Sequence, residues 1–339
     1  MRTDDFDYTL PPEQIAQHPA DPRDSSRLLV YDRRSGEIED TEFKQITRFL
    51  GEKDILVLNE TRVLPARLWA RKLPGGGKVE LLLLKRLAEG TWEALVGGKG
   101  LHAGRKLELI GGGQCEVVDE PGGARRVLEF DLDVEKRLSI IGEMPLPPYI
   151  HEPLQDPDQY QTVFAREDGS AAAPTAGLHF TDSLLERIQK SGVELAFVTL
   201  HVGLDTFAPV READPGQHQI HSEWCSITEA TAQRINRRRE SGGRVIAVGT
   251  TTVRTLETAV RTGSTGQLSG FEGPTRLYIL PGFKFLAIDA LITNFHLPRS
   301  TLLMLVSAFA GRERILEVYR HAIAEKYRFY SFGDAMLIL

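Results

Sequence analysis

The sequence predicts an α/β protein in which a main α/β domain is interrupted by an inserted antiparallel β-barrel. After Gly177, strand and helix patterns alternate along the chain, which is typical of a largely parallel or mixed sheet. Between residues 67 and 132, short strands alternate with glycine clusters instead, as in a meander of antiparallel strands. The chain has 339 residues, whereas a single core usually stops growing at about 250–300 residues, so two domains are expected.

The first regular elements of the α/β domain lie before the glycine-rich stretch. Residues 41–50 (TEFKQITRFL) have a helix-like pattern, and residues 53–58 (KDILVL) form the apolar run of a buried strand. Because this strand precedes the glycine-rich stretch, we interpret that stretch as an insertion into the α/β domain.

Glycines mark the turns of the predicted barrel. Triple glycines at 75–77 and 111–113 separate apolar strands such as 79–87 (VELLLLKRL). The proline-rich run 145–150 (PLPPYI) is a stiff exit from this region. We therefore predict that residues 1–62 and 150–339 form the α/β domain and that residues 63–149 form the barrel.

The C-terminal half supplies the other elements of the α/β domain. Helices are predicted at 181–191, 228–241, 251–263, 300–311 and 312–327, and strands at 193–203, 244–249 and 286–295. The strand order does not follow from these patterns, so a barrel-like closure of this sheet is an alternative to an open sheet.

Composition limits the class of protein. The 41 lysines and arginines against 47 aspartates and glutamates give a net charge of -6, which argues against a wholly basic surface but not against a local basic patch. Two cysteines are too few for a disulfide framework or an iron–sulfur cluster. The N-terminus lacks an apolar leader, and the apolar run 301–310 is shorter than the roughly 20 residues that cross a bilayer. We expect a soluble, cytoplasmic, monomeric protein.

Three histidines lie where active-site residues of α/β folds often occur, at strand ends or in the loops that follow. His201 ends a predicted strand, His296 follows another, and His179 lies in a loop that opens a helix. Histidine can give or take a proton near neutral pH, so these three are candidate catalytic residues. The alternative is that each one only satisfies local backbone groups.

His218 and His221 have the H-x-x-H spacing of some metal ligands, and Glu223 lies nearby. The pattern differs from the H-E-x-x-H motif and no clear helix carries it. We therefore expect no bound metal, and the positioning of a polar substrate is the favoured role.

The segment 244–257 (RVIAVGTTTVRTLE) runs from an apolar strand through Gly249 into a helix that begins with Thr250, Thr251 and Thr252. A helix N-terminus has unpaired N–H groups and a partial positive charge, which suit a carboxylate or phosphate. Arg254 lies one turn further on and is able to pair with such an anion. An ordinary threonine-capped helix is the alternative. The chain has no Walker P-loop motif and no strand followed by G-x-G-x-x-G.

The loop 171–181 (AAAPTAGLHFT) is rich in small residues, including Thr175 and Gly177, and would allow close packing against a flat ligand such as a purine. A tight crossover loop is the alternative.

Five arginines lie in the predicted helix 228–241 or just after it. They form either a solvated helix face or a positive surface for an RNA backbone. These residues are Arg234, Arg237, Arg238, Arg239 and Arg244.

Eight long segments carry ordered motifs, among them 6–33 (FDYTLPPEQIAQHPADPRDSSRLLVYDR), 55–68 (ILVLNETRVLPARL) and 291–311 (LITNFHLPRSTLLMLVSAFAG). The others are 171–181, 199–207, 218–225, 248–257 and 327–337. Together they resemble one family, the S-adenosylmethionine:tRNA ribosyltransferase-isomerases of queuosine biosynthesis. The likeness covers nearly the whole chain and is loose only in the glycine-rich region 67–132.

The resemblance implies an unusual use of S-adenosylmethionine as a co-substrate, with no metal. The ribosyl portion would move onto the aminomethyl group of 7-aminomethyl-7-deazaguanine at the tRNA wobble position. The product would be epoxyqueuosine, with adenine and methionine released. The alternative is a conventional S-adenosylmethionine-dependent tRNA methyltransferase, although the chain lacks the early glycine-rich strand–loop–helix of the common type.

The resemblance also suggests roles for the candidate residues. We expect His179, His201 and His296 to transfer protons or hold the opened ribose, with Asp205 and Asp289 orienting them. We expect Thr250, Thr251, Thr252 and Arg254 to hold a carboxylate or phosphate. Arg23, Arg27, Asn59 and Arg62 are expected to border the cleft near the inserted domain. The tRNA is expected to contact the arginines between 234 and 244.

Overall fold

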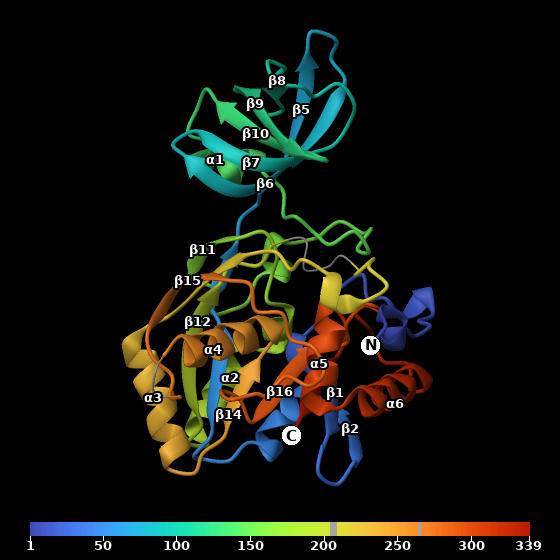
Figure 1. The fold of residues 1–339 in the computed structure, drawn as a ribbon, viewed down its shortest axis with the longest axis vertical. Coiled ribbons are helices and arrows are strands. Elements are labelled where there is room, and N and C mark those ends of the chain that lie inside the picture. The colour runs from blue at the N-terminus through green and yellow to red at the C-terminus, as the bar shows by residue number, and fades with distance from the viewer. Residues whose placement is uncertain (204–208, 264–265) are drawn as a thin grey trace. The chain divides into compact units, whose positions relative to one another are not determined.

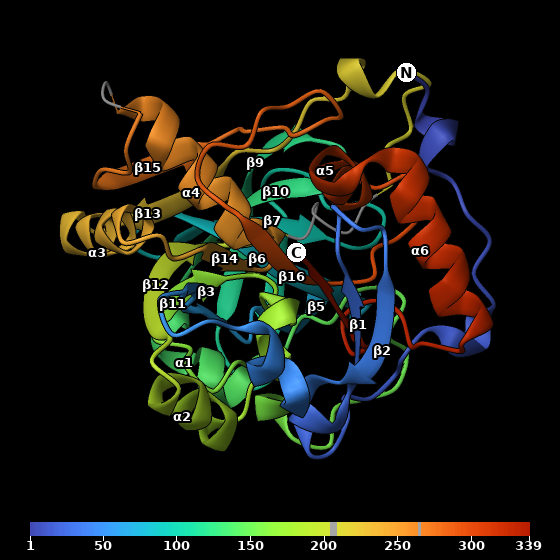
Figure 2. The ribbon, with the colours of Figure 1, turned by 90° about the horizontal axis from the view of Figure 1, so that it is seen from below.

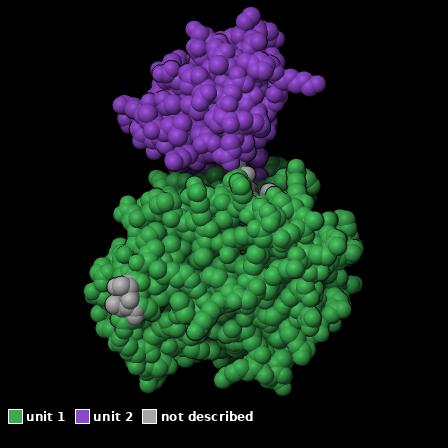
Figure 3. Space-filling model, in the orientation of Figure 1, with its two compact units in different colours: residues 1–62, 147–339 green, residues 63–146 purple. Residues whose placement is uncertain are grey.

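The computed structural model describes residues 1–203, 209–263 and 266–339. The chain forms two compact units, one of residues 1–62 with 147–339 and one of residues 63–146 (Figure 3). The predicted α/β domain with an inserted antiparallel barrel is confirmed. The barrel unit ends at residue 146, against the predicted 149.

The larger unit is built on a nine-stranded mixed sheet (Figure 1). Its strands are β1 (Arg27–Tyr31), β2 (Ile38–Glu42), β3 (Ile55–Asn59), β12 (Glu194–Leu200), β13 (Glu223–Ile227), β14 (Val245–Val248), β15 (Phe271–Thr275), β16 (Ala290–Asn294) and β17 (Ala335–Ile338). The order across the sheet is β15-β13-β12-β3-β14-β16-β17-β1-β2. This sheet is open over the described residues, so the barrel-like alternative for this domain is set aside. A separate ribbon pairs β4 (Thr61–Val63) with β11 (Glu167–Ser170).

The neighbouring strands β12, β3, β14 and β16 run parallel. Their carboxyl ends therefore meet along one side of the sheet, here called the carboxyl edge, and their amino ends meet along the opposite amino edge. Strands β3 and β16 are buried at every position, as expected of parallel strands covered on both faces.

Helices cover both faces of this sheet (Figure 2). Alternate residues of β3 separate the two cores: Ile55 and Val57 pack into one, and Leu56 and Leu58 into the other. The first core includes α3 (Glu229–Glu240), α4 (Thr250–Thr262), α5 (Thr301–Ala310) and α6 (Arg312–Ala324), and the second includes α2 (Asp182–Lys190). Within the described ranges, no helix combines the length and apolar character needed to span a membrane.

Several short segments are 3-10 helices. The predicted helix at 41–50 is one of them, Phe43–Phe49, and its buried Phe43 and Ile46 pack in the second core. Among the described residues the others are Thr3–Phe6, Pro12–Gln14, Arg23–Ser25, Pro157–Tyr160, Thr175–His179 and Pro215–Gln217.

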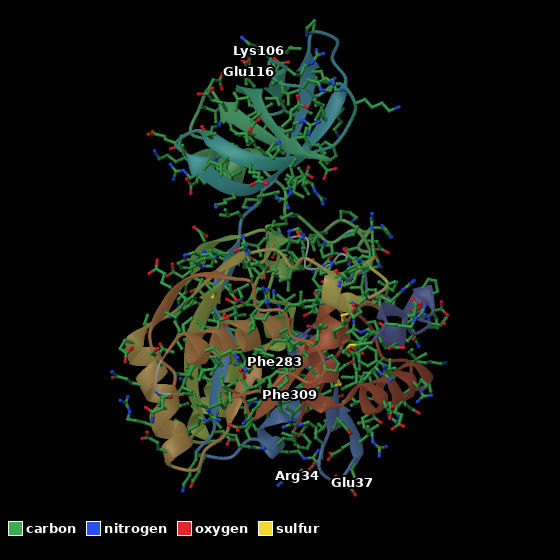
Figure 4. All side chains as sticks on the ribbon, viewed as in Figure 1. Arg34, Glu37, Lys106, Glu116, Phe283 and Phe309 are labelled. Atoms are coloured by element: carbon green, nitrogen blue, oxygen red, sulfur yellow. The ribbon has the colours of Figure 1, made fainter. Side chains whose placement is uncertain are left out.

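The smaller unit is a closed six-stranded antiparallel barrel with the order β10-β7-β6-β5-β8-β9. Its elements are β5 (Arg67–Leu73), β6 (Lys78–Ala88), β7 (Thr91–Val96), β8 (Lys106–Leu109), β9 (Gln114–Gly122), β10 (Arg125–Phe130) and α1 (Val134–Ile141). Alternate residues of β7, such as Trp92 and Ala94, fill its core. Lys106 of β8 and Glu116 of β9 lie opposite one another in the ladder (Figure 4), where opposite charges favour the pairing.

Candidate active site

A pocket lies at the carboxyl edge of the main sheet and is here called the edge pocket. Of the residues predicted from the sequence, Thr175, Gly249, Thr250, Thr251 and His296 line it. The other lining residues are Tyr149, Ala173, Pro174, Ala176, Val202, Thr293, Asn294, Phe295, Leu297, Leu302, Tyr330 and Ser331. The ends of two parallel strands, β14 and β16, thus meet the small-residue loop that begins at Ala171.

His296 follows β16 and is held firmly in the wall of the edge pocket. Its backbone N–H donates to the Tyr319 hydroxyl at 2.8 Å, and its carbonyl accepts from the Tyr8 hydroxyl. Its Nε2 lies 2.7 Å from Thr293 Oγ1. Burial lowers the pKa of His296 to about 3, because a charged imidazolium would lose its hydration there. The ring is therefore neutral near pH 7.

His179 lies behind the edge pocket and contacts it through Asn294. The Asn294 side chain donates through Nδ2 to the Tyr330 carbonyl at 3.2 Å and to His179 Nε2 at 3.1 Å. Because Nε2 accepts, the imidazole proton lies on Nδ1, which donates to Ser26 Oγ at 2.8 Å. Burial lowers the pKa of His179 to about 4. Both ring nitrogens are thus occupied, and His179 orients Asn294, whose Oδ1 accepts from Thr175 at 3.0 Å.

The N-terminus of α4 supplies another wall of the edge pocket. Gly249 adopts φ 85°, a left-handed conformation that favours glycine, and turns the chain from β14 into the helix. Thr250 and Thr251 line the pocket. Thr252 does not, because its hydroxyl donates to the Val248 carbonyl at 2.7 Å inside the core.

Asn59 supports this wall from the end of β3 and is almost fully buried. Its Nδ2 donates to the Leu200 carbonyl at 3.0 Å and to Thr251 Oγ1 at 3.2 Å. Its Oδ1 accepts from the N–H groups of Leu200 at 3.0 Å and Thr61 at 3.2 Å. The predicted ligand-binding residue Asn59 therefore joins the ends of β3 and β12 to α4.

His201 lies at the end of β12 but does not line the edge pocket. Its Nδ1 is 2.9 Å from Thr61 Oγ1, and its ring stacks on Trp224 with centroids 5.1 Å apart. A Cβ on Gly169 would lie 2.8 Å from the ring, so this glycine permits the close approach of β11. Burial lowers the pKa of His201. Asp205, predicted to orient a histidine, lies outside the described residues.

Arg254 lies in a second pocket, where it pairs with Glu223, the acidic residue near the H-x-x-H pattern. The two buried side chains form an ion pair between Arg254 Nη1 and Glu223 Oε2. His218 and His221 line the same pocket. In the described part of the chain, no three His, Cys, Asp or Glu side chains gather closely enough to hold a metal ion.

Five other predicted site residues have different positions. Asp289 precedes β16 at the amino edge, where its carboxylate accepts from Val245 N–H at 2.8 Å, so the prediction that it orients a histidine is corrected. Arg23 donates to the Gln161 carbonyl at 2.6 Å, and Arg27 lies over the Tyr327 ring at 3.7 Å. Gly177 is a packing residue, since a Cβ there would lie 2.9 Å from Phe164 and Thr162. Arg62 is exposed.

The arginines predicted to contact RNA lie at the amino edge, opposite the edge pocket. Arg234 and Arg238 each bind Glu194, at 2.6 Å, at the start of β12. Arg244 pairs with Asp54 at 2.6 Å, and Arg239 donates to the Leu286 carbonyl at 2.6 Å. Arg237 alone of the five is exposed. Four of these arginines therefore hold the end of the sheet, and their contact with tRNA stays a prediction.

Sequence reasoning missed several residues of the edge pocket, chiefly Thr293 and Asn294. Both are polar residues at the end of an otherwise apolar strand, which is a signal that could have found them. Tyr149, Tyr330 and Ser331 come from loops far from His296 in the chain, so no local pattern indicates that they share its pocket.

The two buried histidines predict a loss of stability in mild acid. Their folded-state pKa values, about 4 for His179 and about 3 for His296, lie below the ordinary value of 6.5. As pH falls below 6.5, the unfolded chain takes up protons first, so the free energy of unfolding falls until the folded-state pKa values are reached. Each histidine contributes a slope of about 1.4 kcal/mol per pH unit. Urea unfolding at pH 6.5, 5.5 and 4.5 measures how the free energy of unfolding depends on pH. This free energy should fall less steeply with pH in His179→Asn than in the wild-type protein. The same slope in both proteins would contradict the lowered pKa of His179.

Comparisons with known proteins agree with the resemblance seen in the motifs. Residues 3–338 match the family described as queuosine biosynthesis protein. S-adenosylmethionine:tRNA ribosyltransferase-isomerases of Moorella thermoacetica and Symbiobacterium thermophilum are both 53% identical, over the full length of each chain. A crystal structure of S-adenosylmethionine tRNA ribosyltransferase from Thermotoga maritima is 40% identical, with a TM-score of 0.58, over 99% of this chain and 100% of that one. This protein therefore belongs to the family of S-adenosylmethionine:tRNA ribosyltransferase-isomerases of queuosine biosynthesis.

Proposed function

We propose that this protein transfers and isomerises the ribosyl moiety of S-adenosylmethionine onto 7-aminomethyl-7-deazaguanine at the tRNA wobble position. Epoxyqueuosine-tRNA forms, and adenine and methionine are released. Full-length similarity to enzymes of that name is the observation that carries the proposal. We extend it to a monomeric enzyme that works in the cytoplasm without a metal.

The edge pocket is the proposed site of the chemistry. The sulfonium of the co-substrate acidifies the protons on the neighbouring ribose carbon, so a base is needed to remove one. We assign this role to His296, which lines the edge pocket. In the tautomer whose Nε2–H donates to Thr293 Oγ1, Nδ1 is the basic atom, and no group of the described residues hydrogen-bonds it. His179 acts as a positioning residue through Asn294.

A second proton transfer accompanies the release of adenine. Adenine must gain a proton as it leaves. Burial keeps His179 and His296 neutral near pH 7 in the resting enzyme, so neither carries a spare proton at the start of the reaction. His296 gains a proton when it acts as the base, and this proton, or one from a water molecule, is then passed to adenine.

The decisive experiment incubates the protein with tRNA bearing the aminomethyl base and with S-adenosylmethionine labelled in adenine. Release of free adenine together with a mass increase of the tRNA is the expected result. S-adenosylhomocysteine as the by-product would instead identify a methyltransferase. Binding of tRNA without consumption of the co-substrate would identify a non-catalytic RNA-binding protein, and loss of activity on adding a chelator would identify a metal enzyme.

The arginines of α3 give a separate prediction about tRNA. Because Arg238 is bound to Glu194 at the amino edge, Arg238→Ala should lower the free energy of unfolding by roughly 1 kcal/mol or less. The Kd for tRNA, measured by filter binding, should change less than about twofold, since Arg238 is already paired with Glu194 and lies at the edge of the sheet opposite the edge pocket. Arg237→Ala, on the same helix, is the matched control and should change neither quantity. A large loss of tRNA affinity in Arg238→Ala alone would show that Arg238 contacts the tRNA.

A further inference from the structure

A second cavity adjoins the edge pocket and is here called the Arg254 pocket. Leu302, near the N-terminus of α5, lines both cavities. The Arg254 pocket is also lined by Arg254, Glu223, His218 and Tyr278. The chemistry of the edge pocket does not use any of these four side chains.

Arg254 has one hydrogen-bonding group left over. Its Nε donates to the Leu277 carbonyl at 3.1 Å, and its Nη1 pairs with Glu223. Its Nη2 is buried and has no hydrogen-bond partner among the described residues. Leaving a buried charged donor unsatisfied is costly, so the position of Nη2 in this pocket points to an acceptor supplied by a ligand.

The wall of the Arg254 pocket suits an anion near the N-terminus of α5 and a cation near Glu223. The N-terminus of α5 places Thr301 and Leu302 in the wall, and a helix N-terminus favours negative charge. Glu223 brings a buried carboxylate, whose Oε1 accepts from Gly203 N–H at 2.8 Å. Each carboxylate oxygen accepts more than one hydrogen bond, so Glu223 is also able to receive an ammonium group.

We propose that the Arg254 pocket binds the amino-acid end of S-adenosylmethionine. The α-carboxylate binds Arg254 and the N-terminus of α5, and the α-ammonium binds Glu223. This inference rests on the proposed function, in which the adjoining edge pocket holds the reacting ribose. A neighbouring Arg–Glu pair matches a zwitterion, whereas Glu223 would repel a phosphate and Arg254 would repel a metal ion.

The proposal gives a role to the motif H-x-x-H-x-E at His218–Glu223. Glu223 begins β13 and pairs with Arg254 of α4, so the motif supplies one half of a zwitterion site. His218 closes one wall, where its Nδ1 lies 3.0 Å from Glu212 and its ring meets Tyr278 edge-on.

The test compares S-adenosylmethionine with its decarboxylated analogue. Calorimetry should give a Kd about 10- to 100-fold weaker for the analogue, because a charge-assisted hydrogen bond is lost. In Arg254→Gln the two ligands should bind with nearly equal Kd. Arg261→Gln is the matched control, because Arg261 lies on the same helix and also pairs with a buried glutamate, Glu257. It should keep the preference of the wild-type protein for the carboxylate.

A second variant covers the case in which Arg254→Gln does not fold, as judged by its melting curve. Gly203→Val adds a side chain to the wall of the Arg254 pocket, with its Cβ 3.8 Å from Glu223 Oε1. Because this side chain would occupy the site, the Kd for S-adenosylmethionine should rise about 10-fold or more. Equal binding of both ligands by the wild-type protein, or an unchanged Kd in folded Arg254→Gln or Gly203→Val, would overturn this inference. Adenine release by the wild-type protein would still support the proposed function, and its absence would overturn that function separately.

Discussion

Replacing His296 by asparagine should lower kcat for adenine release by about 10²- to 10⁴-fold, the usual contribution of a positioned base. Asparagine is similar in size but is not basic at neutral pH, so the wall of the edge pocket is kept and proton removal is lost. The KM for S-adenosylmethionine should change less than about threefold, because the base acts on the reacting carbon and not on the binding groups. Steady-state assays with saturating tRNA measure both quantities.

The control for this prediction is His321→Asn. His321 lies on α6 and bonds Asp40 at 2.8 Å, away from the residues of the edge pocket. The variant His321→Asn should leave kcat for adenine release unchanged. A kcat for His296→Asn within tenfold of the wild-type value would remove His296 from the role of base and would favour a part in holding the opened ribose.

Replacing Asn59 by alanine should lower the free energy of unfolding by about 3–5 kcal/mol. The variant leaves the N–H and carbonyl of Leu200 and the N–H of Thr61 without their partner in a buried site, and each unsatisfied group costs roughly 1–3 kcal/mol. Thr251 also loses its contact with β3, so the wall of the edge pocket should loosen. Urea unfolding measures the stability, and the Kd for S-adenosylmethionine measures the effect on the pocket.

Asn236→Ala is a matched control for Asn59. Like Asn59, Asn236 binds the backbone of one residue through both its amide nitrogen and its amide oxygen. Its Nδ2 donates to the Leu268 carbonyl at 2.8 Å, and its Oδ1 accepts from the Leu268 N–H at 3.2 Å. It is only half-buried, so water replaces the lost bonds and the cost should be about 1 kcal/mol. An equal loss in the free energy of unfolding for the two variants would contradict the explanation that Asn59 stabilises the protein because its partners are buried.

The three histidines show how far sequence reasoning extends toward the site. Each follows or opens a regular element, so the sequence predicts the same role for His179, His201 and His296. The structure separates them: His296 lines the edge pocket, His179 orients Asn294, and His201 stacks on Trp224. Their burial and partners come from segments far apart in the chain, and no local pattern carries that information.

The sequence by itself determined the α/β class, the inserted barrel and the family. Each of these depends on periodicity, on turn glycines or on ordered motifs, all of which are local. Only the tertiary structure decided which polar side chains share a pocket, because the strand order β12-β3-β14-β16 brings together chain segments that do not follow one another. The same reason applies to charge: Arg254 and Glu223, or Arg238 and Glu194, become pairs only when the sheet has formed.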